Sequence, residues 1–182
     1  MKFEFKTISS KELFRNPYWN YYLDRYSIND QEFDYHYVNS RGSVIIIPKL
    51  DDTKFLMVEQ YRYLNKKNSI EFPGGGVKLN SNYEITAINE LEEETGYTTH
   101  NLEFIGEFNP CNGITNEICR VYLATNLEKI KSQSEETEKI QLLTLTLEEI
   151  NQLIKSNKIW DSMSITSLYF YVSKFTNKLW KS

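Results

Sequence analysis

GGVKLNSNYEITAINELEEETGY, residues 75–97, is the stretch that decides the fold of this chain. It places three glutamates, Glu90, Glu93 and Glu94, on a helix that directly follows a run of glycines. At roughly 100° per residue these carboxylates span only about 100° of the helix circumference. The apolar residues of the same helix turn toward a different side: Ala87, Ile88 and Leu91. One side of the helix is therefore expected to bind and another to pack.

The three carboxylates form a candidate magnesium site. Carboxylates within about 6 Å of one another repel, and the negative end of the helix macrodipole lies close to them. A bound divalent cation reverses both penalties, and oxygen ligands suit Mg²⁺ or Mn²⁺ better than zinc. The alternative is that the acidic run 92–94 is an ordinary solvated face. The neighbouring glycines favour the metal site.

The ends of this helix are predicted by its flanking residues. Ser81 has capping-box spacing to a glutamate, Asn82 is a second candidate cap, and Gly96 suits the left-handed position after a last turn. We therefore expect a helix over about 82–95. Upstream, residues 69–77 (SIEFPGGGV) predict a short strand that ends in a glycine turn, whose carbonyls approach a metal or phosphate without a Cβ in the way.

Residues 75–97 resemble the Nudix box, G-x5-E-x7-R-E-U-x-E-E-x-G-U, in which U is bulky and apolar. The matching positions are Gly75, Glu90, Leu91, Glu93, Glu94, Gly96 and Tyr97. Two positions depart from the pattern, because Ser81 stands at its first glutamate and Asn89 at its arginine. In the family this arginine helps to orient the neighbouring glutamates, and Asn89 offers only a neutral hydrogen bond in its place.

The similarity extends over roughly residues 17–175 and points to the ADP-ribose pyrophosphatase branch of the family. Segments on both sides of the box resemble that branch: 41–48 (RGSVIIIP), 58–63 (VEQYRY), 70–75 (IEFPGG), 109–117 (NPCNGITNE), 136–140 (ETEKI), 147–150 (LEEI) and 159–161 (IWD). Cys111 and Asn112 disturb the usual loop of the branch. Each segment is weak alone, and their common order and spacing make the resemblance specific.

The resemblance implies an α/β fold, a Nudix-type α/β/α sandwich around a mixed β-sheet, with an N-terminal β-hairpin. The residues agree with a hairpin, since the aromatic-rich segments Trp19–Tyr26 and Glu32–Val38 flank the turn signal Asn29–Asp30. Residues 1–40 are expected to form N-terminal strands with a homodimer contact, as is common in this branch. Residues 41–182 are expected to form the Nudix hydrolase domain.

Further strands and two C-terminal helices follow from the residue pattern. The expected strands are Ser43–Ile47, Phe55–Gln60, Leu102–Phe108, Ile118–Ala124 and Ile140–Leu145. A helix over Leu147–Ser156 begins after Thr146, which is a candidate cap. Asp161 is expected to cap a second helix, whose apolar residues recur at helical spacing: Ile165, Leu168, Tyr169 and Val172.

The resemblance implies hydrolysis of a diphosphate that joins a nucleoside to a second group, with Mg²⁺ or Mn²⁺ as the cofactor. Glu90 and Glu94 are the expected metal ligands, together with the carbonyl of Gly74. Glu93 is assigned to the catalytic group, as a further ligand or as a partner of the ligands.

The general base is expected after the box, because this branch supplies it from a mobile loop there. Glu136 is the preferred candidate and Glu138 the runner-up, both within the polar stretch 131–139. For either residue the alternative is a solvated charged loop.

Substrate contacts are also implied by the branch. Arg62 resembles its arginine near the substrate and is able to bind a phosphate or ribose bidentately, with a surface salt bridge as the alternative. Glu71 matches a polar contact of the branch just before the glycine turn, and Glu117 stands where the family has a further active-site carboxylate. An adenine needs an aromatic platform. Phe33 is one candidate among N-terminal aromatics that are mostly expected to be core or dimer contacts: Trp19, Phe33, Tyr35 and Tyr37.

Composition excludes several other classes of protein. The 182 residues, 40% of them hydrophobic, suffice for one core. A formal charge of −4 and a pI near 5.4 argue against a nucleic-acid groove. The aliphatic run Val44–Ile47 is too short for a membrane span, and the N-terminus lacks a signal-peptide pattern, so a cytoplasmic protein is expected. Cys111 and Cys119 lack metal-site spacing and are expected to be reduced thiols.

Two functions from different classes remain to be compared. The first is a metal-dependent hydrolase that cleaves ADP-ribose to AMP and ribose 5-phosphate, with other nucleoside diphosphate sugars as nearby alternatives. The second is a catalytically weakened nucleotide-sugar-binding Nudix domain, in which the changes at Ser81 and Asn89 have removed turnover. The surviving carboxylates of the box favour the enzyme.

Overall fold

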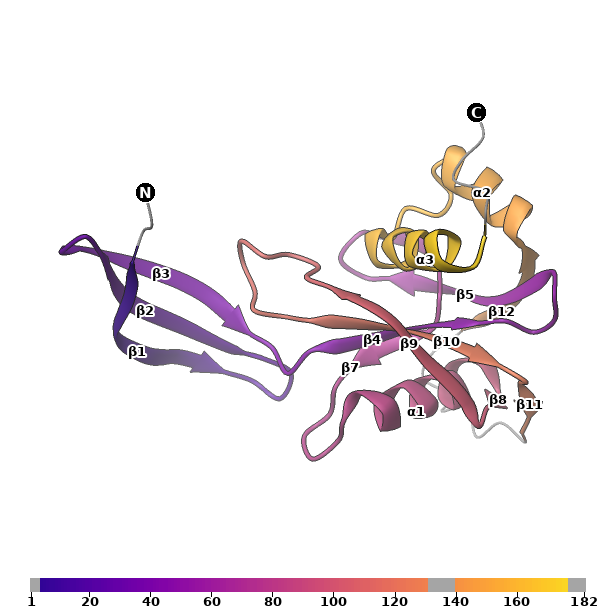
Figure 1. The fold of residues 1–182 in the computed structure, drawn as a ribbon, viewed down its shortest axis with the longest axis horizontal. Helices are drawn as coiled ribbons and strands as arrows, with labels where there is room; N and C mark the ends of the chain where they lie inside the picture. The colour runs from indigo at the N-terminus through magenta and orange to yellow at the C-terminus, as the bar shows by residue number, and fades with distance from the viewer. Residues whose placement is uncertain (1–3, 131–139, 177–182) are drawn as a thin grey trace. The chain divides into compact units, whose positions relative to one another are not determined.

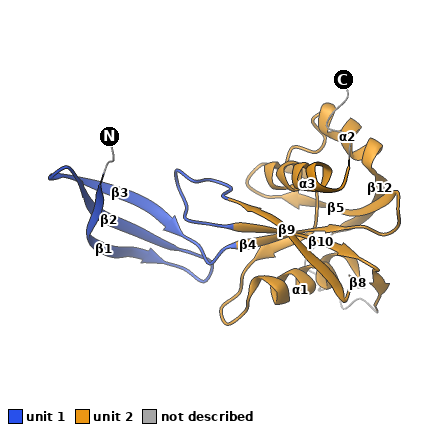
Figure 2. Cartoon of the chain, viewed as in Figure 1, with its two compact units in different colours: residues 1–42, 109–118 blue, residues 43–108, 119–182 orange. Residues whose placement is uncertain are grey.

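The computed structural model describes residues 4–130 and 140–176 of the chain. They divide into two compact units, shown in different colours in Figure 2. The first unit contains residues 1–42 and 109–118, and the second contains residues 43–108 and 119–182. None of the helices in these ranges is long and apolar enough to cross a membrane.

The first unit is built on a three-stranded antiparallel sheet in the order β1 (Phe5–Arg15), β2 (Asn20–Ile28), β3 (Gln31–Asn39). Asn29 and Asp30 have φ angles of 49° and 66°, the left-handed backbone of a two-residue hairpin turn. The expected hairpin is therefore present as β2 and β3. The sequence did not indicate β1, because irregularities in its pairing with β2 interrupt the two-residue alternation of its side chains.

The segment 109–118 joins this unit from far along the chain. The backbone N–H of Val38 donates to the carbonyl of Ile114 at 2.9 Å. The Tyr35 phenol donates to the carbonyl of Gly113 at 3.0 Å, and the Asn116 side chain accepts from the backbone of Ser40 at 2.9 Å. These contacts fix the segment against the end of β3.

The second unit contains a mixed four-stranded sheet in the order β7 (Gly74–Gly76), β4 (Ser43–Pro48), β10 (Cys119–Thr125), β9 (Asn101–Phe108). Strand β10 runs parallel to β4 and antiparallel to β9. A separate antiparallel sheet has the order β12 (Gln141–Thr146), β5 (Lys54–Arg62), β6 (Lys67–Glu71). Two short strands, β8 (Tyr97–Thr98) and β11 (Glu128–Lys129), form a small pair.

Strand β4 separates two hydrophobic cores of the second unit. Ile45 and Ile47 belong to the core that α2 (Leu147–Lys155) and α3 (Ser162–Phe175) cover. Val44 and Ile46 belong to the core beneath α1 (Tyr83–Thr95). All four side chains are at most 3% exposed, as expected for a strand buried on both faces. Figure 1 shows α1 and α3 on opposite sides of this sheet, which confirms the α/β sandwich.

The helix ends follow the caps that the sequence predicts. The Asn82 side chain accepts from the backbone of Ile85 at 2.8 Å, so Asn82 rather than Ser81 caps α1, and Gly96 ends this helix at φ 72°. Thr146 forms a full capping box with Glu149 at the start of α2. Asp161 caps α3 by accepting from the backbone of Ser164 at 2.8 Å.

Candidate active site

The glycines before α1 form a strand instead of the predicted turn. Gly74, Gly75 and Gly76 make up β7 and pair with β4, and none of the three has a positive φ angle. Their role is to leave space. A Cβ at Gly74 would overlap the carbonyl oxygen of Val44, and a Cβ at Gly75 would lie 2.5 Å from the carboxyl carbon of Glu90. The prediction of a glycine turn is therefore wrong. The absence of a Cβ does matter, because it makes room for the Glu90 carboxylate of the helix.

Helix α1 brings two carboxylates against this strand. The backbone N–H of Gly74 donates to Oε2 of Glu94 at 3.1 Å, and the Glu90 carboxylate lies beside Gly75. The two glutamates are one helical turn apart, so their side chains share a face of α1. Both are partly buried, while Leu91 on another side of the helix is fully buried in the core. The structure therefore places the two carboxylates on the side of α1 that meets β7 and Leu91 on a packing side, and the binding of a metal by these carboxylates stays a prediction.

Glu93 takes a different position. Its side chain is exposed and forms an ion pair of 3.6 Å with Lys78, which follows β7. The exposure of the pair makes it a weak interaction. The structure therefore gives Glu93 an exposed cation as its partner, while Glu90 and Glu94 are the carboxylates next to the glycine strand.

The donors around β7 fit a magnesium-type ion. Mg²⁺ is usually held by one or two carboxylates, with waters and substrate phosphates completing its shell. Glu90 and Glu94 supply two carboxylates, and the missing Cβ of Gly75 leaves room at one of them. In the part of the chain that the structure describes, no three Asp, Glu, His or Cys side chains form a complete metal cage. This donor set fits an ion shared with a substrate better than a structural ion.

The two residues that depart from the Nudix box lie at the start of α1 and on its exposed surface. The Ser81 hydroxyl is 3.0 Å from the Thr86 hydroxyl and donates to the carbonyl of Asn82 at 3.3 Å, so it stabilises the start of α1. Asn89 is exposed on the helix surface. The backbone N–H of Gly74 contributes to the orientation of Glu94.

Arg62 and Glu71, both predicted to contact substrate, form an ion pair with each other. Nε of Arg62 donates to Oε1 of Glu71 at 2.9 Å, and Nη2 donates to Oε2. Gln60 also donates to Oε2, at 3.4 Å. The Glu71 side chain is 6% exposed and that of Arg62 is 45% exposed, so the carboxylate is an internal anchor and the guanidinium reaches the surface.

Arg62 also lies in the electrostatic field of the helix carboxylates. The hydrogen bond to Glu71 raises the pKa of the Arg62 guanidinium against the opposing effect of burial. The charges of Glu71, Glu94 and Asp161 raise its pKa further. Arg62 is therefore a permanent cation near Glu94.

The other predicted residues belong to the first unit or fall outside the described residues. Phe33 and Glu117 belong to the first unit, where Phe33 is 42% exposed and Glu117 is partly buried. Glu136 and Glu138 lie outside the described residues, so their assignment stays a prediction. The structure brings together Glu90, Glu94 and Gly74, and it joins Arg62 to Glu71.

The sequence did not indicate Gln60 or Lys78 as members of this site. Strand pairing contains the signal for Gln60, because Glu71 lies opposite Val58 and the residues at two-residue spacing, Gln60 and Arg62, share that face. Lys78 gives no such signal, since a lysine after a glycine run is unremarkable in composition.

Comparison with known proteins decides the family. A NUDIX domain is matched over residues 39–165, which is most of the chain. The chain belongs to the Nudix family. Its Nudix box, residues 75–97, extends from β7 through α1, so the matched domain contains the carboxylates described above.

Two curated relatives match nearly the full length of this Nudix protein. It is 33% identical over 171 residues to the methanol dehydrogenase activator of Bacillus methanolicus, and 29% identical over 170 residues to the ADP-ribose pyrophosphatase of Bacillus subtilis. Each alignment covers 92% of both chains. These matches confirm the predicted Nudix enzyme family and its ADP-ribose pyrophosphatase branch.

A solved structure confirms the Nudix fold. The crystal structure of an ADP compounds hydrolase superposes with a TM-score of 0.79 and covers 95% of this chain and 97% of its own. The two sequences are 14% identical, so the similarity concerns the arrangement of strands and helices.

Proposed function

We propose that this Nudix protein hydrolyses the diphosphate bond of nucleoside diphosphate sugars, with ADP-ribose as the substrate. Water adds to one phosphorus atom, the bridging P–O bond breaks, and the products are AMP and ribose 5-phosphate. The observation that carries the proposal is the placement of Glu90 and Glu94 against β7, where the backbone of Gly74 and the missing Cβ of Gly75 hold and accommodate their carboxylates. The full-length similarity to an ADP-ribose pyrophosphatase supports the choice of substrate.

The proposed cofactor is Mg²⁺ or Mn²⁺. Glu90, Glu94 and the carbonyl of Gly74 would hold the ion. When bound, it would neutralise the phosphate oxygens and activate water for attack. The chain contributes the negative charge that selects a hard cation and the helix that keeps two carboxylates one turn apart. Glu93, on the same helix, is proposed to bind the ion as a further ligand or to contact the residues that bind it. To do so, its carboxylate would leave the ion pair with Lys78.

Arg62 is proposed to bind a phosphate of the substrate. The Glu71 carboxylate accepts hydrogen bonds from Nε and Nη2 of Arg62. The other edge of the guanidinium, formed by Nη1–H and the second N–H of Nη2, therefore points away from Glu71. That edge presents two parallel N–H groups, the arrangement that binds a phosphate bidentately. The role proposed for Glu71 is to hold this edge in position.

The remaining assignments rest on the resemblance to the branch. Glu136 is proposed as the general base, with Glu138 as its alternative, and Phe33 and Glu117 as substrate contacts. A homodimer through the N-terminal strands is also proposed. Exposed apolar side chains on β1 support it: Ile8, Leu13 and Phe14.

A second candidate function is a nucleotide-sugar-binding domain with little turnover. It is favoured by the departures from the box, since Ser81 contributes to the start of α1 and the neutral Asn89 replaces an arginine. The carboxylates beside β7 favour the enzyme, because simple binding of a diphosphate does not require two adjacent acidic groups.

The two functions separate in one assay of the full chain. We expect ADP-ribose with Mg²⁺ to give AMP and ribose 5-phosphate in equal amounts, measured by chromatography and ³¹P NMR, and to give neither after chelation of the metal. Binding of ADP-ribose without product, unchanged by Mn²⁺ and across a panel of nucleoside diphosphate sugars, would establish the binding domain instead.

A further inference from the structure

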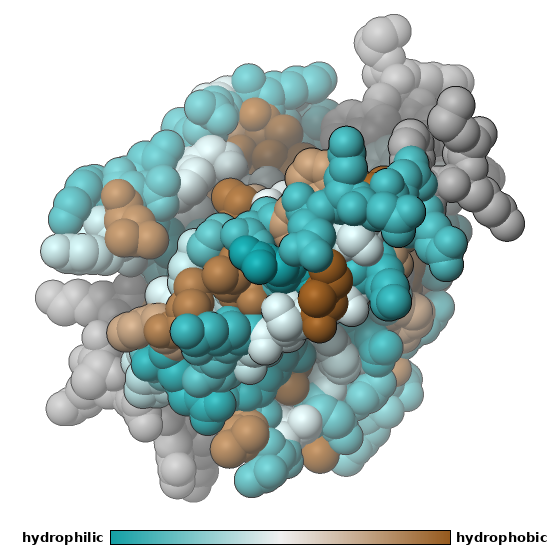
Figure 3. Space-filling model, turned by 90° about the vertical axis from the view of Figure 1, so that its left-hand side faces the viewer, coloured by the Kyte–Doolittle hydropathy of each residue, from teal (hydrophilic) through white to brown (hydrophobic). Residues whose placement is uncertain are grey.

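Two serines of α3 are buried, although serine usually lies at a protein surface. Figure 3 shows hydrophilic side chains covering most of the coloured surface that it displays. By contrast, Ser164 is 1% exposed and Ser167 is fully buried. The Ser164 hydroxyl accepts a hydrogen bond of 2.9 Å from the backbone N–H of Phe72, whereas the Ser167 hydroxyl has no hydrogen-bond partner among the described residues. The two serines therefore share a helix and a burial, and they differ in this one bond.

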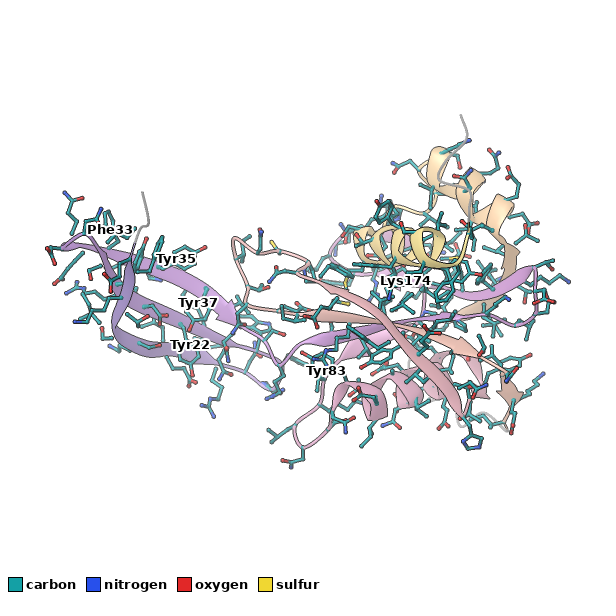
Figure 4. The ribbon with its side chains drawn as sticks, viewed as in Figure 1. Tyr22, Phe33, Tyr35, Tyr37, Tyr83 and Lys174 are labelled. Carbon is teal, nitrogen blue, oxygen red and sulfur yellow. The ribbon has the colours of Figure 1, made fainter. Side chains whose placement is uncertain are left out.

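The bond reaches the chain where it crosses from one sheet to another. Strand β6 belongs to the sheet of β5 and β12, and β7 belongs to the sheet of β4, β9 and β10. Phe72 lies between β6 and β7 and is buried. Figure 4 labels Tyr83 at the start of α1 and Lys174 near the end of α3, the two helices on opposite sides of this crossing. A buried backbone N–H without an acceptor is destabilising, so the hydroxyl of Ser164 fixes the chain as it leaves β6.

The link from Phe72 to Gly74 has little freedom. Residue 73 is a proline, whose ring fixes its own φ and restricts the residue before it to extended backbone. The carbonyl of Pro73 accepts from the backbone N–H of Ile46 at 2.9 Å. The N–H of Gly74 then donates to Glu94. Three consecutive residues are therefore held by three different elements, α3, β4 and α1, and a shift of the first is passed on to the third.

The first turn of α3 is itself held in place. Asp161 accepts from the backbone N–H of Ser164 at 2.8 Å, which sets the start of the helix. The indole of Trp160 donates to the carbonyl of Asn68 in β6 at 3.1 Å. The turn is thus anchored to β6 on one side and to the crossing on the other. This anchoring gives the Ser164 hydroxyl a defined position from which to hold the backbone of Phe72.

We propose that Ser164 is a positioning residue for the hydrolysis described above, and this inference rests on that proposed function. Its hydroxyl places the Phe72 N–H and, through the short link that follows, the Gly74 N–H that binds Glu94. Ser164 therefore acts through the Glu94 carboxylate and not on the substrate. Its removal should change kcat more than KM, because it displaces a group of the catalytic centre and leaves the substrate contacts in place.

Ser164→Ala and Ser167→Ala form a matched pair, since each removes one buried hydroxyl from the same helix. The first readout is amide hydrogen exchange of the full chain, followed by ¹H–¹⁵N NMR without metal or substrate. In Ser164→Ala the exchange rate at Gly74 should rise at least about tenfold more than the rates along β10, in the middle of the same sheet. In Ser167→Ala the two rises should agree within about twofold.

The second readout is the hydrolysis of ADP-ribose with Mg²⁺. Ser164→Ala should lower kcat about tenfold and leave KM within about threefold of the parent, while Ser167→Ala should keep kcat within about twofold. Equal losses of kcat in the two variants would overturn the proposal, because the bond to Phe72 would then have no effect of its own. A Ser164→Ala variant in which exchange at Gly74 rises no more than along β10 would overturn it as well.

The two readouts separate this inference from the proposed function. A parent chain that does not hydrolyse ADP-ribose would refute the proposed function, and exchange at Gly74 would still decide whether Ser164 positions this backbone. If Ser164→Ala does not fold, Ser164→Cys takes its place, because a thiol is a weaker acceptor than a hydroxyl. It should show the same changes to a smaller degree, and parental exchange at Gly74 in that variant would overturn the proposal.

Discussion

The backbone N–H of Gly74 donates a 3.1 Å hydrogen bond to the Glu94 carboxylate, so strand β7 holds a side chain that lies 20 residues away in sequence. In the general Nudix pattern an arginine next to the first helical glutamate helps to orient the carboxylates, and Asn89 occupies that position here. The bond from Gly74 gives Glu94 a fixed position that does not depend on residue 89. Strand β7 therefore supplies Glu94 with a backbone donor although the box is incomplete.

Gly75→Ala is expected to impair hydrolysis of ADP-ribose severely. The new Cβ would lie 2.5 Å from the carboxyl carbon of Glu90, so the carboxylate must move away from β7. We expect kcat to fall by about 100-fold, because a small displacement of a catalytic group costs about that much.

Gly76→Ala is the matched control, because no described atom lies within 4 Å of a Cβ at that position. It should keep kcat within about twofold of the parent and match its melting temperature, since alanine adds little strain where the glycine φ is ordinary. Equal losses of kcat in the two variants would show that space beside Glu90 is not the reason for the glycine.

Arg62→Met is expected to destabilise the protein by about 2 kcal/mol, because it removes the guanidinium that pairs with the buried Glu71 carboxylate. Replacing both residues with methionine should recover part of this loss, since the buried charge is then gone. Urea unfolding of both single variants and the double variant measures the coupling. Strictly additive free energies of unfolding would contradict the ion pair.

Asn82→Ala should lower the free energy of unfolding by about 1 kcal/mol, because Asn82 caps α1 through the backbone N–H of Ile85. Ser81→Ala should cost less than about 0.5 kcal/mol, since the Ser81 hydroxyl is a minor contact at the helix start. Thermal unfolding followed by circular dichroism ranks the two variants. The reverse order would show that the capping box predicted at Ser81 is the true cap.

Tyr122 is expected to make the fold sensitive to alkali. Burial, helped by the hydrogen bond to Glu84, raises the pKa of its phenol to about 12. Because the folded pKa exceeds the ordinary value of 10.0, this stabilisation is complete below pH 10 and is lost as the pH rises toward about 12. The loss amounts to about 2–3 kcal/mol over that window.

The Tyr122 prediction is checked by urea unfolding across this pH window in the parent and in Tyr122→Phe. The variant has no phenol to ionise, so its stability should fall less steeply with pH than that of the parent. Parallel curves for the two proteins would show that Tyr122 ionises as readily in the folded chain as in the unfolded chain.

The sequence predicted the local elements well, because each has its own signal. The caps Thr146 and Asp161 stand where a polar side chain precedes a periodic apolar pattern, and the structure confirms both. At α1 the structure confirms the second candidate, Asn82, instead of the capping box at Ser81. The buried strand β4 was equally clear as an unbroken aliphatic run. Strand β1 was missed, because two irregularities displace its alternation and most of its side chains remain exposed.

The sequence identified several residues of the candidate site but few of the contacts between them. Glu90 and Glu94 share a helix face by spacing alone, so their proximity was foreseeable. The partnership of Arg62 with Glu71 depends on the pairing register of β5 and β6, which no single segment specifies. The sequence predicted a turn at the glycines of β7, because it does not show that Gly75 packs against the Glu90 side chain. The position of Glu90 makes a side chain at residue 75 unfavourable.

The most direct measurement of the central claim compares Glu94→Gln with Glu92→Gln, two changes of one charge on the same helix. With ADP-ribose and Mg²⁺, Glu94→Gln should release AMP at least about 100-fold more slowly than the parent, because it removes a proposed metal ligand. Glu92→Gln should stay within about threefold of the parent, since it loses the same charge away from β7. A parental rate in Glu94→Gln, with the parental melting temperature, would contradict the assignment of the catalytic centre to the carboxylates beside Gly74 and Gly75.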